Sequence, residues 1–223
     1  MTALAPRDAY RLWAPTYASE TAISFIEEEL ARELSPPLAG KRLLDAGCGT
    51  GRRLLGVGAA LALGIDASPE MLKSGHAHRV AAADLYALPF TAGSFDVVWC
   101  RLVLGHLRHL QSAYDELARV CAPGGGLLVS DFHATAAAAG HKRSFRDSSG
   151  VVHEIEHHIY DDAAHISAAA QSGFTLLRAR DGAIGPSVEQ FYTRAGRQDV
   201  YLKDLGLPVV ASFCFRRIDA NPD

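Results

Sequence analysis

The sequence has no long hydrophobic run and few cysteines. Its longest apolar stretch, residues 56–65, is too short and too rich in glycine and alanine to span a bilayer. The N-terminus has no basic start followed by an apolar run, so we expect no secretory signal. These absences favour a cytoplasmic protein in which the thiols stay free and buried. The cysteines concerned are Cys48, Cys100, Cys121 and Cys214.

The chain also lacks an excess of basic residues, since 22 Lys and Arg face 25 Asp and Glu. Nucleic-acid phosphates are bound by clustered Lys and Arg, so we expect neither a nucleic-acid nor a membrane partner. No internal repeat, low-complexity segment or linker divides the 223 residues. We therefore expect residues 1–223 to form one α/β domain; the sequence does not indicate an oligomeric state.

Apolar strands and amphipathic helices alternate along the first part of the chain. This alternation predicts a parallel sheet covered on both faces. The expected strands span residues 42–45, 61–65, 80–83, 94–100 and 127–130, and the expected helices span 20–34, 50–60 and 110–120, with one more after Ser68.

The pattern changes after residue 131. We expect an irregular segment, an exposed strand, a helix, a strand, a helical excursion and a final strand. The pattern of strands and helices along the whole chain predicts a doubly wound, mostly parallel seven-stranded sheet of Rossmann-like type. The last strand is expected to be antiparallel. The segments concerned span residues 132–149, 151–160, 161–172, 174–180, 184–207 and 209–215.

The most informative segment is Leu43–Gly51, where an apolar strand runs into glycines at alternate positions. Gly47, Gly49 and Gly51 have no Cβ, so the backbone can turn tightly and approach a ligand. The following helix would point its N-terminus into the same crevice. We expect the basic Arg52 and Arg53 at its start to face solvent. The pattern predicts a nucleoside-type cofactor at the carboxyl end of a parallel strand.

Acidic residues end the next two strands. Asp66 follows Gly47 by 19 residues, where a carboxylate accepts both ribose hydroxyls. Asp84 ends the third strand, where an acid can accept from an adenine amino group while the next backbone N–H donates to the ring. The fourth strand leads to Arg101 at the same crevice.

Together these residues resemble the class I S-adenosylmethionine-dependent methyltransferases. The resemblance is strongest to the small-molecule group, which includes quinone-biosynthesis C-methyltransferases and carrier-protein ester O-methyltransferases. It covers about residues 7–132. The matching segments are 43–51, 64–68, 83–90, 94–98, 117–125 and the aromatic segment 10–17.

The resemblance implies S-adenosylmethionine as cofactor. Asp45 and the backbone at Gly47 and Gly49 would hold its methionine part, and the Arg101 backbone would face the methionine amino group. Cys48 would be a small spacer beside the cofactor.

The resemblance also implies an adenosine site. Asp66 would hold the ribose. Ala67 and Met71 would line the adenine face, and Asp84 and Leu85 would contact the adenine edge.

The residues that contact the methyl acceptor are harder to identify from the sequence than those that bind the cofactor. Methyl transfer from a sulfonium depends mainly on alignment of the reactants and exclusion of water, which require no particular residue type. His106 and His133 follow the fourth and fifth strands and are candidate catalytic residues, with packing as the alternative. Tyr10 and Trp13 could form an aromatic wall over the sulfonium or the substrate. Tyr17 would close over the cofactor.

His153, His157 and His158 stand in a strand-like stretch. Residues 153 and 157 would share one face with 158 opposite, which favours a polar edge strand over a metal site.

The resemblance implies transfer of a methyl group to a small organic acceptor. Residues 1–38, 132–160 and 184–207 would form a substrate cap over the carboxyl ends of the strands. A nicotinamide-dependent oxidoreductase and a non-catalytic cofactor-binding protein on the same fold remain alternatives.

Overall fold

One seven-stranded sheet organises the molecule. The structure is a computed structural model that describes residues 3–17 and 20–218. The strand order is β3-β2-β1-β4-β5-β9-β8; β1 to β5 pair in parallel and β9 runs antiparallel to both neighbours. The predicted Rossmann-like sheet is therefore confirmed. Its strands are β1 (Arg42–Ala46), β2 (Leu61–Asp66), β3 (Val80–Ala82), β4 (Phe95–Arg101), β5 (Cys121–Phe132), β8 (Phe174–Ala183) and β9 (Pro208–Arg217).

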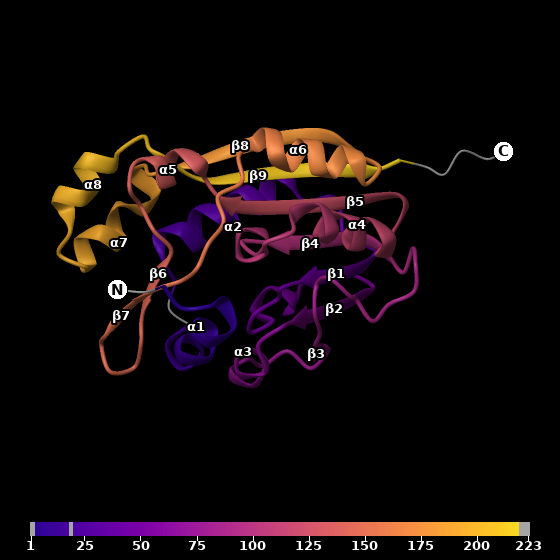
Figure 1. Ribbon diagram of the computed structural model, residues 1–223, viewed down its shortest axis with the longest axis horizontal. Helices are drawn as coiled ribbons and strands as arrows, with labels where there is room; N and C mark the ends of the chain where they lie inside the picture. Colours follow the sequence, from indigo (N-terminus) through magenta and orange to yellow (C-terminus); the bar gives the residue numbers. More distant parts are fainter. Residues whose placement is uncertain (1–2, 18–19, 219–223) are drawn as a thin grey trace.

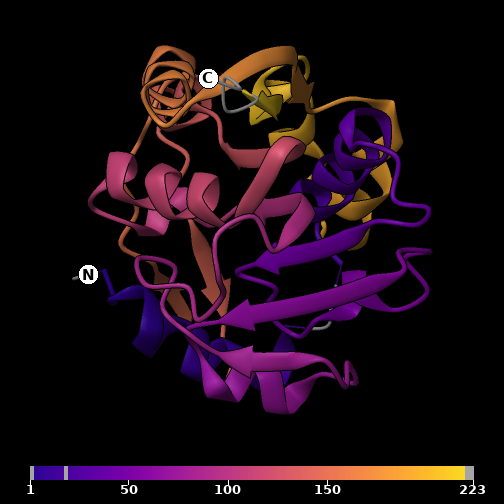
Figure 2. The same ribbon diagram turned by 90° about the vertical axis from the view of Figure 1, so that its right-hand side faces the viewer.

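Helices cover both faces of the sheet. Helix α2 (Ala22–Leu34) lies on one face, and α4 (Leu110–Val120) and α6 (Asp162–Gln171) lie on the other (Figures 1 and 2). The start of α2 is fixed by a capping box between Thr21 and Ser24, which satisfies two otherwise free N–H groups. The sheet thereby gains two apolar cores, one under α2 and one under α4 and α6.

The helix expected over residues 50–60 is wrong. Only a single 3-10 turn, Arg52–Leu54, forms there. Gly51, Gly56 and Gly58 adopt positive φ angles of 70°, 68° and 77°, which an α-helix does not allow. Consequently no helix of several turns begins at the glycine turn.

The segment after β5 is more ordered than predicted. It contains α5 (Ala134–Ala138) and a hairpin of β6 (Ser144–Arg146) and β7 (Val152–Glu154). The strand expected over 151–160 is wrong beyond residue 154, because the chain leaves the hairpin there. The predicted helical excursion 184–207 is confirmed as a 3-10 turn, α7 (Glu189–Arg194) and α8 (Gln198–Asp204).

The N-terminal segment and the hairpin form one unit. Leu4 pairs with the chain just after β7, since its N–H donates to Glu154 O and its carbonyl accepts from Glu156 N. Trp13, at the end of α1 (Pro6–Trp13), stacks on Phe145 of β6 with ring centroids 5.1 Å apart. Figure 1 shows α1 and the β6–β7 hairpin on the same side of the sheet.

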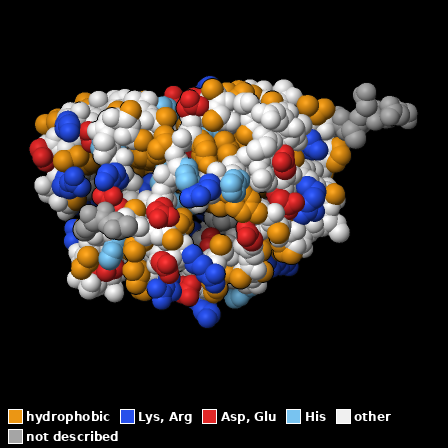
Figure 3. Space-filling model, in the orientation of Figure 1, with side chains coloured by type: hydrophobic (Ala, Val, Ile, Leu, Met, Phe, Trp, Pro, Cys, Tyr) orange, Lys and Arg blue, Asp and Glu red, His pale blue; other side chains and the backbone are white. Residues whose placement is uncertain are grey.

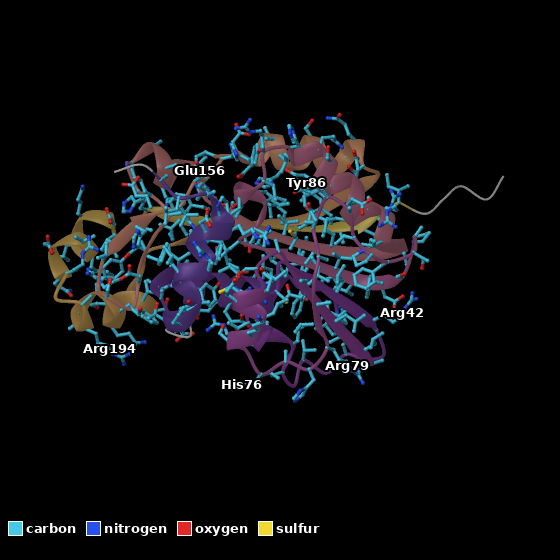
Figure 4. The ribbon with its side chains drawn as sticks, turned by 60° about the horizontal axis from the view of Figure 1, so that its bottom comes forward. Arg42, His76, Arg79, Tyr86, Glu156 and Arg194 are labelled. Atoms are coloured by element: carbon cyan, nitrogen blue, oxygen red, sulfur yellow. The ribbon has the colours of Figure 1, made fainter. Side chains whose placement is uncertain are left out.

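The two ends of the sheet are distinct. Arg42, at the start of β1, and Arg79, just before β3, lie at one end of the molecule in Figure 4. Arg194 of α7 lies at the opposite end. The carboxyl ends of the parallel strands face this second end, where the N-terminal unit also packs. The remaining α-helix is α3 (Pro69–Ser74), which follows β2.

Candidate functional site

A tight turn follows β1 and depends on glycine. Gly47 and Gly49 have φ angles of 86° and 58°, and the N–H of Gly47 donates to Ile65 O of β2 at 2.8 Å. A Cβ at position 47 would lie 2.3 Å from Val103 Cγ2. Glycine is therefore required here by both backbone conformation and space.

Asp66 ends β2 and faces this turn. Its Oδ2 accepts from Gly49 N and its Oδ1 from Ser68 N, both at 2.8 Å. Burial raises the pKa of Asp66, and the two N–H donors oppose that rise. Each carboxylate oxygen keeps a free lone pair, so this side chain can still accept from a ligand's hydroxyls.

A cavity opens over the turn at the carboxyl ends of β1, β2 and β4. Such a crevice outside the strand ends is where ligands bind in open α/β sheets. Figure 3 shows the corresponding face, with basic and histidine side chains gathered beside a hollow near its centre. The lining residues are Pro6, Arg7, Tyr10, Tyr17, Gly47, Gly49, Arg53, Ile65, Asp66, Ala67, Ser68, Met71, Ala83, Asp84, Leu85, Arg101, Leu102, Val103, His106, Leu107 and Arg143.

The cavity thus brings together most residues predicted from the sequence. Four predicted residues are not among its lining. Asp45 and Cys48 are buried beside the turn, and burial raises the pKa of the Cys48 thiol. Trp13 packs on the hairpin instead. His133 caps α5 by accepting from Thr135 N through Nδ1.

Asp45 is an unpaired carboxyl group in the interior. It is completely buried at the end of β1, and neither of its oxygens has a hydrogen-bond partner in the described structure. Burial raises the pKa of Asp45 to about 6, although Arg53 and Arg101 oppose the rise. Unpaired buried acceptors are rare, so this group is suited to a cationic or hydrogen-bonding ligand.

Sequence reasoning missed a buried ion-pair network below the cavity. Glu27 of α2, with no exposed surface, binds Arg101 at 2.7 and 2.8 Å and Arg53 at 3.0 Å. Ser130 Oγ donates to the same carboxylate at 2.7 Å. The expectation that Arg53 faces solvent is therefore wrong, since its side chain is 11% exposed. The signal was present, because Glu27 falls on the apolar face of its predicted helix with Leu30 and Ile23.

Tyr10 and His106 form a pair at the mouth of the cavity. The Tyr10 hydroxyl and His106 Nε2 lie 2.9 Å apart. Burial and the nearby Arg143 guanidinium lower the pKa of His106 to about 3. His106 is therefore a neutral imidazole at physiological pH. Its Nε2 accepts from Tyr10 when Nδ1, 3.4 Å from Glu156 O, carries the proton.

His157 does not share a strand face with His153. It lies under Gly105, its ring centroid 5.1 Å from that of His106 and its Nε2 3.7 Å from Asp131 Oδ1. Within residues 3–17 and 20–218 no group of three or more His, Cys, Asp or Glu side chains is arranged to hold a metal ion. In the same residues no helix has the length and apolar character needed to cross a bilayer.

Residues 44–129 match the family model of a methyltransferase domain. A malonyl-[acyl-carrier protein] O-methyltransferase of Herminiimonas arsenicoxydans is 36% identical over 148 residues, which is 62% of this chain and 51% of that protein. A ubiquinone biosynthesis O-methyltransferase of Thiobacillus denitrificans is 36% identical over 113 residues, 45% of this chain and 48% of that protein. This chain thus spans about half the length of these curated relatives, or less for others.

Solved structures support the fold. An S-adenosylmethionine-dependent methyltransferase of Mesorhizobium loti aligns with a TM-score of 0.66 at 22% identity, covering 86% of this chain and 98% of that one. The [4+2]-cyclase SpnF aligns with a TM-score of 0.68 at 20% identity, covering 96% of each. The sequence match and the shared fold agree: residues 44–129 match a methyltransferase domain, and the chain has the fold of solved S-adenosylmethionine-dependent methyltransferases.

Proposed function

We propose that this protein transfers a methyl group from S-adenosylmethionine to a small organic acceptor. One observation carries the proposal: a single cavity at the strand ends combines the glycine turn with the Asp66 carboxylate, beside the unpaired Asp45. The net charge of −3 favours a small acceptor over a nucleic acid. The cysteines' burial as free thiols is consistent with a cytoplasmic location.

The residues present fit this cofactor. Asp66 would accept from the ribose hydroxyls, and the Asp45 carboxyl supplies acceptors for the methionine ammonium group, whose charge would offset the cost of the buried carboxylate. Ala67 and Met71, together with Ile65, would give the apolar contact that an adenine face requires, since all three line the cavity. Because Gly47 has no side chain, the cofactor could approach its backbone closely.

Two residues that follow β3, Asp84 and Leu85, would contact the adenine edge. Asp84 Oδ1 accepts from Tyr86 N at 2.9 Å, which orients the carboxylate at the cavity wall. Leu85 is 5% exposed and lines the same wall. Tyr17, from the N-terminal unit, would cover the bound cofactor.

When bound, S-adenosylmethionine supplies a sulfonium methyl group that passes in line to a nucleophilic atom of the acceptor. The chain's part is to align the two and exclude water. Tyr10 and His106 stand where the acceptor would enter, and Nε2 of a neutral His106 can accept a hydrogen bond from an acceptor hydroxyl that takes the place of the Tyr10 hydroxyl. His133, outside the cavity, is not part of this proposal.

The N-terminal helices and residues 132–160 would cap the acceptor, because Tyr10, Tyr17 and Arg143 line the cavity. Residues 184–207 pack instead on α2 and Phe132. We therefore propose that residues 184–207 support the cap, and that only the N-terminal helices and residues 132–160 contact the acceptor.

Calorimetric titration of S-adenosylhomocysteine into the wild-type protein tests the proposal. Binding is expected for the wild type, and Asp66→Ala should abolish it because the ribose acceptor is lost. Asp162→Ala, an exposed acid on α6, is the matched control and should bind as the wild type does. Circular dichroism melting of both variants shows whether each is folded at the titration temperature.

A thermal-shift panel separates the alternatives. Stabilisation by a reduced nicotinamide dinucleotide and none by S-adenosylhomocysteine would replace the proposal with an oxidoreductase. Binding of S-adenosylhomocysteine together with no transfer of labelled methyl to any small-molecule extract would favour a non-catalytic binding protein.

A further inference from the structure

A second cavity adjoins the first. Tyr17, Leu102 and Arg143 line both, so they form the partition between the two spaces. Leu102 adopts φ 59°, a left-handed conformation that is costly for a residue with a Cβ and is often found at functional sites. The second cavity is lined by Trp13, Tyr17, Thr21, Ile23, Ser24, Arg52, Leu102, Phe132, Lys142, Arg143 and Ser144.

The charges around this second cavity are of one sign. Its charged lining residues are Arg52, Lys142 and Arg143, and none of its described lining residues is acidic. Lys142 is neutralised, since its Nζ lies 3.0 Å from both carboxylate oxygens of Glu154. Arg143 differs, because within residues 3–17 and 20–218 its guanidinium makes no ion pair with a carboxylate. Its neighbour is the neutral Tyr10 hydroxyl, where burial raises the pKa and the charge and hydrogen bond of Arg143 oppose that rise. The Arg143 side chain is nevertheless half-buried.

The position of Arg143 is fixed by the hairpin. Its carbonyl accepts from Ile155 N at 2.9 Å, and two residues further Phe145 is buried against Trp13. The guanidinium is close enough to His106 to lower the pKa of that imidazole. A positive charge is thus held between the cofactor cavity and the second cavity, beside the acceptor entrance.

The remaining lining of the second cavity combines an apolar and aromatic part with three hydroxyl residues. The apolar and aromatic residues are Trp13, Tyr17, Ile23, Leu102 and Phe132, and the hydroxyl residues are Thr21, Ser24 and Ser144. A half-buried guanidinium without a counterion is unfavourable, and its planar donors match a carboxylate in a bidentate pair. The cavity therefore combines an anion-binding group with an apolar surface.

We infer that the methyl acceptor carries a carboxylate that Arg143 binds, with its hydrocarbon or aromatic body against Trp13 and Phe132. This inference rests on the proposed function, since it names the acceptor class of the same site. The carboxylate would lie at the partition, within reach of the cofactor cavity. Arg52 adds positive charge to the lining of the second cavity.

Matched probes test the inference. Benzoate and benzamide, and octanoate and octanamide, are titrated into the protein saturated with S-adenosylhomocysteine, with Trp fluorescence and calorimetry as readouts. The wild type should bind the carboxylate of at least one pair about 10- to 100-fold more tightly than its amide. Arg143→Gln should remove this preference, and Arg143→Lys should keep part of it, since the charge stays but the bidentate fork is lost.

Arg146→Gln is the matched control. It removes the same charge from the same hairpin, but Arg146 lines neither cavity and its guanidinium bonds Gly150 O. Equal response to both members of every probe pair in the wild type, no response included, would overturn the inference. So would a carboxylate preference that survives Arg143→Gln. The proposed function fails by a different result, namely a wild-type protein that does not bind S-adenosylhomocysteine.

Discussion

Three consecutive glutamates in α2 should respond very differently to the same substitution. Glu27, Glu28 and Glu29 are equally polar, but Glu27 has no exposed surface, the Glu28 side chain is 39% exposed and Glu29 is exposed. Glu27→Gln would remove the buried counter-charge of Arg101 and leave it only the partly exposed Glu28, whose Oε2 lies 2.7 Å from Arg101 Nη2. At the wall of the cofactor cavity, Arg53 would likewise keep only Glu28, whose Oε2 lies 3.8 Å from Arg53 Nε.

The expected cost follows from the buried pair. Removing one partner of a buried ion pair typically costs about 3–5 kcal/mol. The Arg53 and Arg101 guanidinium groups and the Ser130 hydroxyl overcome burial and lower the pKa of Glu27 from 4.5 to about 2. That fall corresponds to roughly 3 kcal/mol of stabilisation by the ionised form. The two routes agree, so we expect Glu27→Gln to lower the free energy of unfolding by about 3 kcal/mol.

The pH dependence gives a second check. Because the folded pKa of Glu27 is depressed, its stabilisation is fully present above pH 4.5 and is lost as pH falls towards about 2. The stability difference between wild type and Glu27→Gln should therefore shrink over this interval. Urea unfolding at several pH values measures it, provided that each variant unfolds in one cooperative transition.

The neighbouring glutamates are internal controls. Glu29→Gln should change the free energy of unfolding by less than about 0.5 kcal/mol, and Glu28→Gln by about 1 kcal/mol or less, because solvent screens their charges. Two results would refute the assignment of a buried network below the cavity. One is a free energy of unfolding for Glu27→Gln within 1 kcal/mol of the wild type at pH 7. The other is a stability difference from the wild type that depends on pH no more for Glu27→Gln than for Glu29→Gln.

Three further outcomes are expected. Asp45→Asn should stabilise the free protein at pH 7.5 by up to about 3 kcal/mol, because the pKa of Asp45 is raised from 3.8 to about 6 and its ionised form is disfavoured. Urea unfolding should show this gain disappearing below about pH 4, while calorimetry shows weaker S-adenosylhomocysteine binding; an unchanged affinity would contradict the assigned role. Gly47→Ala should cost about 2–4 kcal/mol from left-handed strain and contact with Val103, and Val103→Ala in the same chain should restore only the contact part. The His106 imidazole should stay neutral from pH 8 to about pH 4 in NMR titration, and protonation near pH 6 would show that burial and Arg143 do not act on it as described.

Local patterns in the sequence determined the sheet and its cofactor side. Buried parallel strands are continuous apolar runs, and a glycine turn or an acid directly after such a run must lie at the carboxyl edge of the sheet. For this reason Gly47, Asp66, Asp84 and Leu85 could be placed together without a structure, and the structure brings them to one cavity. The helix expected over residues 50–60 failed where three positive-φ glycines outweighed a helical hydrophobic pattern.

Only the tertiary structure decided which charges are buried and which are left unpaired. Glu27 meets Arg101 across 74 positions in the chain, and Arg143 reaches the cavity because a hairpin folds back onto α1. No periodicity encodes such contacts, because they depend on how whole elements pack and not on spacing within one element. The sequence therefore predicted the cofactor class, while packing decided the charges around the two cavities, where the Arg143 guanidinium stands beside aromatic and apolar side chains.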